Sequence, residues 1–271
     1  MKRTVATFQQ AKQEGRRLAT LTAYDYATAK LADDCDIDGI LVGDSLGMVC
    51  LGYPNTLQVT MEDMIHHTRA VARATRKALL IGDLPFMSYQ TSVSDAIRNA
   101  GRLVQEGGAE AIKLEGGAIV LPQIRGIVRA QIPVMGHLGL TPQSVNAFGG
   151  FKVQGRDADS ARRILDDAKR LVDAGVFAIV LECLPAELAA EITAAIPVPT
   201  IGIGAGLDCD GQILVYHDLL GLYGDFQPKF VKVFADAGAT SREGIRAYAA
   251  AVRQKEFPGP EHEFHSKAVK S

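Results

Sequence analysis

Cysteine is scarce in this chain of 271 residues, and the four cysteines lie far apart in the sequence. They form neither a CxxC pair nor a spacing typical of a zinc site: Cys35, Cys50, Cys183 and Cys209. This pattern argues against a disulfide scaffold of the kind found in small secreted domains. We therefore expect reduced thiols and a cytoplasmic location.

Long apolar runs and dense clusters of basic residues are also missing. No apolar run approaches the ~20 residues that span a bilayer, so we expect no membrane segment. The net charge is −2 and Lys and Arg are dispersed, which argues against a nucleic-acid partner. Residues 1–17 are basic but lack the apolar core of a secretory signal. A polar N-terminal helix within residues 1–16 is favoured over a short transit peptide, because serine is not enriched there.

Short apolar runs and amphipathic segments alternate along the rest of the chain. Hydrophobic residues make up 47% and charged residues 22%, as in a globular protein with a large core. The runs predict strands at 18–23, 40–42, 79–83, 111–115, 133–137, 177–182, 199–206 (strand and turn) and 213–216. Seven or eight such units with no linker favour a single (β/α)8 TIM barrel over a doubly wound sheet. The last unit is the weakest, because residues 207–212 leave no room for a helix.

The predicted barrel is one catalytic domain over residues 1–271. We expect a closing helix at 240–252 and a polar, mobile tail over 258–271. Asp25 is placed to N-cap the helix that follows it, and we favour this role over catalysis. The polar segment 140–156 is unusually long for a loop in a compact domain, and such loops are usually functional.

Four of the apolar runs end in an acidic residue. Asp44 follows Ile40–Val42, and Asp83, Glu115 and Glu182 close three later runs. A carboxylate at the edge of a core is unfavourable unless it is paired or binds a metal. Because ligands bind at the carboxyl ends of the strands in α/β folds, the acids mark the expected site.

Asp44, Asp83 and Glu115 close three successive strands, which are neighbours in a barrel. Carboxylates a few ångström apart repel one another unless a cation lies among them, and oxygen ligands suit Mg²⁺. Any one of these acids alone would be interpreted as a helix cap or a surface residue. Their recurrence favours a divalent metal site.

Lys113 and Glu115 lie two apart on one strand, so their side chains point the same way. Lys113 would either hold the carboxylate of an anionic substrate or form a buried pair with Glu115 that needs no ligand. The spacing does not choose between these two interpretations.

His137 and Glu182 end the fifth and sixth predicted strands. Glu182 is flanked by Leu181 and Cys183, an apolar setting suited to a proton-transfer residue. From strand six it would face a metal-bound substrate across the barrel mouth, as a base that removes a proton next to a carbonyl. The alternative is a cap for the helix predicted at 186–196. Gly202–Gly206 is interpreted as a tight turn and not as a phosphate loop, since no helix start follows it.

Ten motifs follow one another from about residue 18 towards Phe257-Pro258: Leu21–Asp25, Gly43–Met48, Gly82–Phe86, Lys113–Gly117, Gly136–Ser144, Phe148–Gly155, Leu181–Pro185, Ile201–Gly206, Asp210–Gln212 and Pro228–Lys232. Together they resemble the ketopantoate hydroxymethyltransferase family. The departures are small: Leu184 stands where a β-branched residue is common, and a few extra residues follow His265.

The resemblance implies a Mg²⁺-dependent transfer of a hydroxymethyl group from methylenetetrahydrofolate to α-ketoisovalerate (3-methyl-2-oxobutanoate), giving 2-dehydropantoate in pantothenate and coenzyme A synthesis. It implies that the metal is held by Asp44, Asp83 and Glu115, and that the keto acid is contacted by Asp44, Ser45, Asp83 and Lys113. It makes Glu182 the catalytic base and places His137 at the substrate. It also implies a cytoplasmic homo-oligomer, a decamer.

The residues alone agree with an enolate mechanism, in which Glu182 deprotonates the keto acid and the loop 140–156 excludes water. Two other functions are open at this point. One is a metal-dependent lyase that acts on 2-oxo acids without folate. The other is a non-catalytic barrel that binds a phosphorylated ligand at Gly202–Gly206, and such a protein would not need Glu182.

Overall fold

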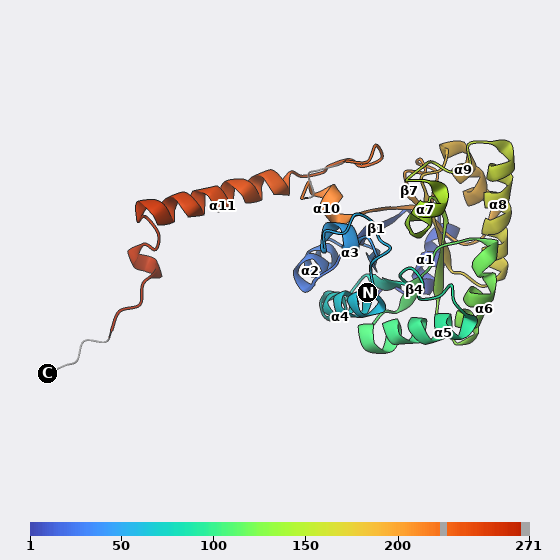
Figure 1. Cartoon of the computed structure of the whole chain (residues 1–271), viewed down its shortest axis with the longest axis horizontal. Helices are drawn as coiled ribbons and strands as arrows, with labels where there is room; N and C mark the ends of the chain where they lie inside the picture. Colours follow the sequence, from blue (N-terminus) through green and yellow to red (C-terminus); the bar gives the residue numbers. More distant parts are fainter. Residues whose placement is uncertain (223–226, 267–271) are drawn as a thin grey trace. The chain divides into compact units, whose positions relative to one another are not determined.

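The computed structural model, which describes residues 1–222 and 227–266, contains a closed parallel barrel (Figure 1). Within these residues eight strands pair in sequence order, and β8 pairs with β1 to close the ring. The strands are β1 (Leu18–Thr22), β2 (Gly39–Val42), β3 (Leu79–Asp83), β4 (Ala111–Lys113), β5 (Val134–Gly139), β6 (Ala178–Glu182), β7 (Thr200–Ile203) and β8 (Gly211–Leu214). The predicted (β/α)8 TIM barrel is confirmed.

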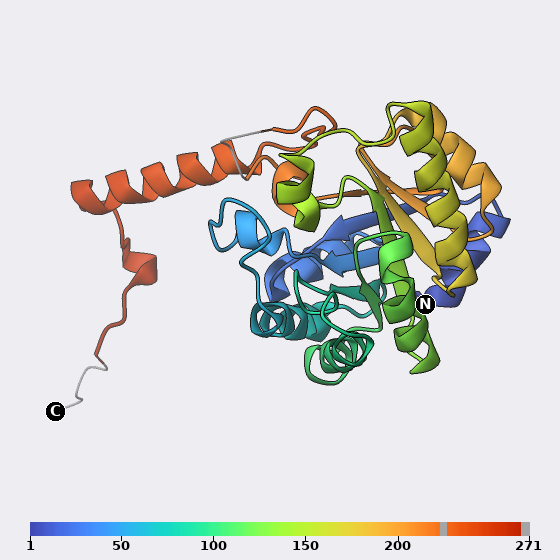
Figure 2. The same cartoon turned by 45° about the vertical axis from the view of Figure 1, so that its right-hand side comes forward.

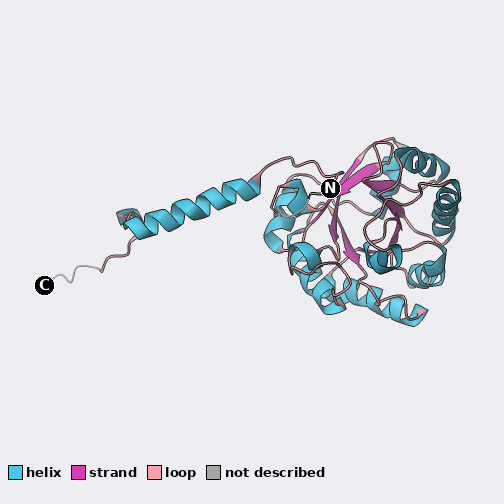
Figure 3. Ribbon diagram, turned by 45° about the horizontal axis from the view of Figure 1, so that its top comes forward, coloured by secondary structure: helices cyan, strands magenta, loops and turns pink. Residues whose placement is uncertain are grey.

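Helices surround the strands, as the cyan ring around the magenta barrel in Figure 3 shows. α6 and α8 lie side by side on the outside (green and yellow in Figure 2). The helices of the barrel are α1 (Val5–Gln13), α2 (Tyr26–Asp34), α3 (Leu46–Val49), α4 (Met61–Ala74), α5 (Val93–Arg102), α6 (Leu121–Arg129), α7 (Val145–Phe148), α8 (Ala158–Asp173) and α9 (Ala186–Ala195). Short α10 (Tyr216–Leu219) follows β8. The Asp25 side chain accepts a hydrogen bond from the Thr28 amide at the start of α2, which confirms it as an N-cap.

The N-terminal helix α1 covers the amino-terminal end of the barrel. Its Phe8 is fully buried and packs edge-on against Phe177, with ring centroids 6.0 Å apart. β2 begins with a glycine for this reason: a Cβ on Gly39 would lie 2.9 Å from Cζ of Phe8. The predicted N-terminal helix is therefore part of the barrel core.

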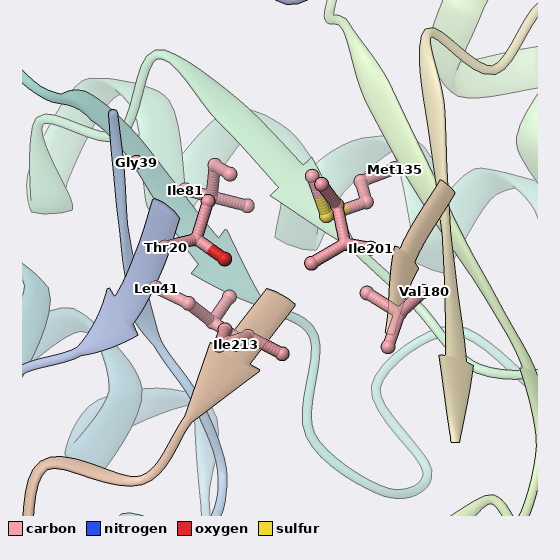
Figure 4. Close-up of a pocket in the computed structure, with 8 residues that line it drawn as sticks. All are labelled: Thr20, Gly39, Leu41, Ile81, Met135, Val180, Ile201 and Ile213. Atoms are coloured by element: carbon pink, nitrogen blue, oxygen red, sulfur yellow. The ribbon is translucent and has the colours of Figure 1, made fainter. Parts of the chain in front are cut away.

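The interior of the barrel is filled by inward-facing side chains of the strands. A small cavity remains among residues that share this inward orientation (Figure 4): Thr20, Gly39, Leu41, Ile81, Met135, Val180, Ile201 and Ile213. All of these side chains except that of Thr20 are apolar, and the Thr20 hydroxyl donates to the Gln212 carbonyl at 2.8 Å. The cavity thus belongs to the core and offers no polar group for a ligand.

The bounds of several predicted strands differ from those observed, and the largest difference, at the eighth strand, has a physical cause. The eighth strand was placed at 213–216 from its apolar run, whereas β8 is Gly211–Leu214. Gly211 is needed because a Cβ there would lie 2.6 Å from the Leu18 carbonyl oxygen, and Gln212 is exposed, so neither residue reads as core. β4 ends at Lys113, two residues earlier than predicted.

The chain divides into two units, of which residues 1–216 and 229–231 form the barrel. The second unit comprises the described residues among 217–228 and 232–271, and contains α11 (Ala237–Gln254) and a short turn at Pro260–His262. α11 is longer than the helix predicted at 240–252. Part of the predicted tail, residues 267–271, lies outside the described residues. The single-domain organisation stays a prediction.

Candidate active site

Acidic and basic side chains from five strands meet at the carboxyl end of the barrel. Each belongs to the end of its strand or to the residues just after it: Asp44 follows β2, Asp83 ends β3, Lys113 ends β4, Glu115 follows it, His137 lies in β5 and Glu182 ends β6. All except Glu182 are at most 4% exposed. The structure therefore brings these six sequence-predicted residues into one connected network, and the surface interpretation of the acids is wrong.

Lys113 is the cation at the centre of this network. Its Nζ lies 2.8 Å from Asp83 Oδ2 and 3.7 Å from Glu115 Oε1. Burial lowers the pKa of a lysine, but the charges of Asp83 and Glu115 outweigh it and raise the pKa of Lys113 above its ordinary value. The ammonium thus stays charged, and the predicted proximity of Lys113 and Glu115 is confirmed.

His137 connects Glu115 to Glu182. Its Nδ1 lies 3.5 Å from Glu115 Oε1, and its Nε2 lies 3.2 Å from Glu182 Oε2. Burial and the charge of Lys113 lower the pKa of His137, but the two carboxylates outweigh them and raise it to about 9. The raised pKa favours the protonated imidazole at neutral pH, and its Nε2 makes a charged contact with Glu182 that lacks hydrogen-bond geometry.

Glu182 is the most accessible member of the network, with a side chain 15% exposed. The N-cap of α9 is Pro185, and no side chain caps that helix end. The interpretation of Glu182 as a helix cap is therefore wrong. Its carboxylate contacts the network through His137, and its exposed part is accessible to a ligand at the mouth of the barrel.

The acidic side chains of the site carry more negative charge than the two cations, Lys113 and His137, can balance. Burial raises the pKa of Asp44, and the charges of Asp83 and Glu115 raise it further, well above its ordinary value. Burial and Glu115 also raise the pKa of Asp83, against the effect of Lys113. The pKa of Glu115 is instead lowered, because His137 and Lys113 outweigh its burial. The deficit of positive charge therefore lies at Asp44 and Asp83.

Asp83 Oδ1 is buried without a hydrogen-bond partner, whereas Glu115 Oε1, also without a hydrogen bond, lies 3.7 Å from Lys113 Nζ and 3.5 Å from His137 Nδ1. An orphaned oxygen such as Asp83 Oδ1, beside the deficit of positive charge at Asp44 and Asp83, fits a hard cation. Across residues 1–222 and 227–266, no group of three or more His, Cys, Asp or Glu side chains is arranged to hold a metal by itself. Mg²⁺ usually takes one or two carboxylates and completes its shell with water and substrate oxygens, and the residues present fit that mode. The three-acid ligand set stays a prediction.

Ser45 lies beside the acids at the start of α3, and its Oγ is 2.8 Å from the hydroxyl of Tyr24. Tyr24 is 1% exposed, and its carbonyl oxygen accepts a hydrogen bond from His67 Nδ1 at 2.6 Å. Sequence reasoning singled out Ser45 but not Tyr24, which lies in a different motif. The tyrosine restricts the direction in which the Ser45 hydroxyl points.

Gln143 is a second residue that sequence reasoning missed. It is 5% exposed, and its Nε2 donates to Asp44 Oδ2 and to the Leu84 carbonyl, each at 2.9 Å. It lies in the short turn Pro142–Ser144 of the loop that was predicted to be functional. The only signal in the sequence was its place in the motif Gly136–Ser144.

Within Gly202–Gly206, the first two residues end β7 and residues 204–206 form the tight turn, in line with the predicted strand and turn. Gly204 and Gly206 have φ of 64° and 83°, and a Cβ on Gly204 would lie 3.0 Å from the Phe230 ring. The next element is the strand β8, so no helix start follows that would bind a phosphate.

Comparison with known sequences decides the family. A sequence model described as ketopantoate hydroxymethyltransferase matches residues 2–260. The chain belongs to the ketopantoate hydroxymethyltransferase family. A protein named 3-methyl-2-oxobutanoate hydroxymethyltransferase from Clostridium novyi (strain NT) is 64% identical over 264 residues, which cover 97% of this chain and 96% of the relative. A protein of the same name from Clostridium acetobutylicum is 61% identical over the same shares. The chain is therefore an enzyme of the transferase class.

Solved structures outside this family share the fold. Phosphonopyruvate hydrolase has a TM-score of 0.62 at 15% identity, covering 97% of this chain and 92% of the other. The 2,3-dimethylmalate lyase, described as a member of the PEP mutase/isocitrate lyase superfamily, has a TM-score of 0.59 at 15% identity, covering 98% and 93%. At this identity the likeness concerns the barrel alone. No helix among residues 1–222 and 227–266 is long and apolar enough to cross a membrane.

Proposed function

We propose that this enzyme transfers a hydroxymethyl group from methylenetetrahydrofolate to 3-methyl-2-oxobutanoate, giving 2-dehydropantoate in pantothenate biosynthesis. Its Clostridium relatives carry the name of this acceptor. The observation that carries the proposal is the network in which His137 lies between Glu182 and Glu115, and Lys113 links Glu115 to Asp83 with its unpartnered buried oxygen. A keto acid bound beside these carboxylates could be deprotonated by Glu182, which is the first step of the transfer.

Asp44 and Asp83, with Glu115 beside them, would hold Mg²⁺ at the side of the site that lacks positive charge. When bound, the ion would supply a Lewis acid that stabilises negative charge on the keto oxygen. Lys113 would attract the substrate carboxylate, because it stays charged while buried. The Ser45 hydroxyl, directed by Tyr24, would complete the contacts to the keto acid.

Glu182 would act as the base. Its carboxylate takes the proton from C3 of the keto acid, and the electron pair of the C–H bond forms the enolate. C3 then bonds to the methylene carbon carried by the folate, and the C=N π electron pair of the iminium moves onto the folate nitrogen. A water molecule next displaces that nitrogen: the C–N bond breaks, its electron pair and one water proton leave with tetrahydrofolate, and the water oxygen becomes the hydroxyl of the product. His137 keeps Glu182 in place through the 3.2 Å contact. The loop 140–156 would limit the access of other water molecules to the reactive one-carbon unit.

Proton NMR of the keto acid in D₂O tests the first step directly. With enzyme and Mg²⁺ but no folate, we expect the C3 proton to exchange with solvent. Glu182→Gln should abolish the exchange, because its amide cannot accept the proton. Glu187→Gln is the matched control, since Glu187 lies exposed on α9 and should leave the exchange unchanged.

The same sample then receives methylenetetrahydrofolate, and formation of 2-dehydropantoate is followed. The proposal fails if neither exchange nor folate-dependent product is seen. Exchange without product would instead favour a lyase that acts on 2-oxo acids without folate.

Location and assembly complete the proposal. We place the enzyme in the cytoplasm because all four cysteines are free, as in a reducing compartment. We also propose a homo-oligomer, a decamer by the resemblance of its motifs.

A further inference from the structure

We propose that Gln143 is a positioning residue that fixes the carboxylates of Asp44 and Glu115 for a divalent cation. The inference rests on the proposed function, because it assigns the two acids to a metal site. Gln143 is nearly fully buried. It lies in the turn Pro142–Ser144, away from the strands β2 and β4 that precede the two acids. No other amide side chain makes a hydrogen bond to Asp44 or Glu115 among the residues that the structure describes.

Every polar atom of the Gln143 side chain has a partner of the right kind. Nε2 donates to Asp44 Oδ2 and to the Leu84 carbonyl, each at 2.9 Å. Oε1 accepts from the Tyr89 hydroxyl at 2.8 Å and from Gln90 Nε2 at 3.3 Å. Rotation of the amide by 180° would place oxygen against the oxygens of Asp44 and Leu84, and nitrogen against Gln90 Nε2. The amide is therefore held in one orientation, with its donor side on Asp44.

The backbone of Gln143 holds the second acid. Its amide donates to Glu115 Oε2 at 3.0 Å. Tyr89 strengthens the connection, because its hydroxyl accepts from the Glu115 amide at 3.2 Å while it contacts Gln143 Oε1. Tyr89 is 1% exposed, so water does not compete for these bonds.

One oxygen of each acid is thereby occupied and another is left over. Gln143 occupies Asp44 Oδ2 and Glu115 Oε2, while Glu115 Oε1 has no hydrogen bond and only the longer contacts of 3.5 Å to His137 and 3.7 Å to Lys113. Asp83 shows the same division: its Oδ2 is held by Lys113 and by the Asp44 amide, and its Oδ1 has no partner. A carboxylate that is fixed at one oxygen presents the other in a defined direction. Partners of this kind raise metal affinity by restricting the ligands before the ion binds.

A residue that merely braced the loop would make the same contacts, so the test must separate metal affinity from folding. We would titrate the purified enzyme with Mn²⁺, which suits the same oxygen ligands as Mg²⁺, and measure free Mn²⁺ by electron paramagnetic resonance. Gln143→Met keeps the length of the side chain but removes both hydrogen-bonding groups. We expect its Mn²⁺ affinity to fall about 10–100-fold, as for other partners of metal ligands.

Two further variants set the scale of this measurement. Asp83→Ala removes a proposed ligand and should show the larger loss. Gln212→Met removes an amide that bonds to the Gly206 carbonyl on the outside of β8, and it should bind Mn²⁺ as the wild type does. A thermal melt of each variant records whether it is folded.

Tyr89→Phe keeps the test decisive if Gln143→Met does not fold. It removes the hydroxyl that bonds to Gln143 Oε1 and to the Glu115 backbone but leaves both hydrogen bonds from Gln143 Nε2, so it should weaken Mn²⁺ binding in the same direction by a smaller factor. If the wild type binds Mn²⁺ and both folded variants bind it with the same affinity, the positioning role is overturned and the proposed function still stands. Absence of Mn²⁺ binding by the wild type would overturn this inference together with the metal site of the proposed function.

Discussion

At the scale of single residues, buried carboxylates serve two different purposes in this protein. Those at the barrel mouth lack positive charge or hydrogen-bond donors, as the orphaned oxygen of Asp83 shows. Asp33, at the end of α2, is buried to a similar degree but is fully satisfied. Its two oxygens accept hydrogen bonds from the backbone amides of Arg76, Lys77 and Ala78, at 2.8–3.1 Å. The number of hydrogen-bond donors around a buried carboxylate, and not its burial, distinguishes a carboxylate of the candidate active site from one that stabilises the fold.

Asp33 therefore gives a prediction about stability and pH. Burial raises its pKa, but the three backbone amides outweigh burial and lower it below the ordinary value. A lowered pKa means that the stabilisation is present above the unfolded pKa of about 3.9 and is lost as pH falls through the folded pKa. We expect Asp33→Asn to lower the free energy of unfolding by about 1–3 kcal/mol at pH 7. The difference from the wild type should shrink below about pH 4.

Urea unfolding at a series of pH values from 7 to 3 measures this difference. Asp34→Asn is the control, because Asp34 is exposed and pairs only with Lys30 on the same helix. A difference between wild type and Asp33→Asn that stays constant across the series would contradict the assignment.

Sequence reasoning found the site residues that lie at strand ends and missed those that act from elsewhere. Asp44, Asp83 and Glu115 were recognisable because each closes an apolar run, and a barrel places the ends of successive strands together. Gln143 was not recognisable, because its contact with Asp44 joins residues 99 positions apart through a loop of no regular pattern. Tyr24 reads as a core aromatic until its hydroxyl is seen beside Ser45.

At the scale of elements, periodicity predicted most strands and helices because the barrel buries continuous apolar runs. It failed where packing requires a residue that is not apolar, as at Gly211 in β8. It also did not show the short helix α7 inside the loop 140–156, since four residues carry too little pattern. The interface between α1 and the barrel follows from a contact between Phe8 and Gly39 that no local pattern encodes.

The contact between α1 and β2 gives a prediction for Gly39→Ala. The added Cβ would lie 2.9 Å from Phe8 Cζ and 3.2 Å from Thr20 Cγ2, closer than ordinary van der Waals contact. Overpacking of this kind lowers the free energy of unfolding by about 1–3 kcal/mol. The loss should be smaller in a Phe8→Leu background, because the shorter side chain leaves room for the methyl group.

A double-mutant cycle measured by urea unfolding tests this coupling. The four proteins are the wild type, the two single variants and the double variant. Strictly additive losses would show that Gly39 is required for a reason other than its contact with Phe8.

At the scale of the whole molecule, the open question is what covers the apolar residues of the second unit. α11 exposes Ile245, Tyr248 and Val252 at 67%, 60% and 44%. Their spacing of three and four residues places them on one face of the helix. Tyr248 packs against Phe257 with ring centroids 5.7 Å apart, which shields only part of this face. A contiguous apolar face of this kind is typical of an interaction surface.

A second copy of the chain is the occupant that the proposed homo-oligomer supplies, and this gives a prediction about mass. A decamer of 29.0 kDa chains has a mass of about 290 kDa. Sedimentation equilibrium at micromolar concentration should give this value for the wild type.

Ile245→Glu places a charge on the apolar face of α11 and should lower the mass, because burial of an unpaired charge in an interface is unfavourable. Arg246→Glu introduces the same side chain at the next position of α11, which lies on a different side of the helix, and should leave the mass unchanged. A monomeric wild type would refute the assembly, and an undiminished mass for Ile245→Glu would place the interface between copies away from α11.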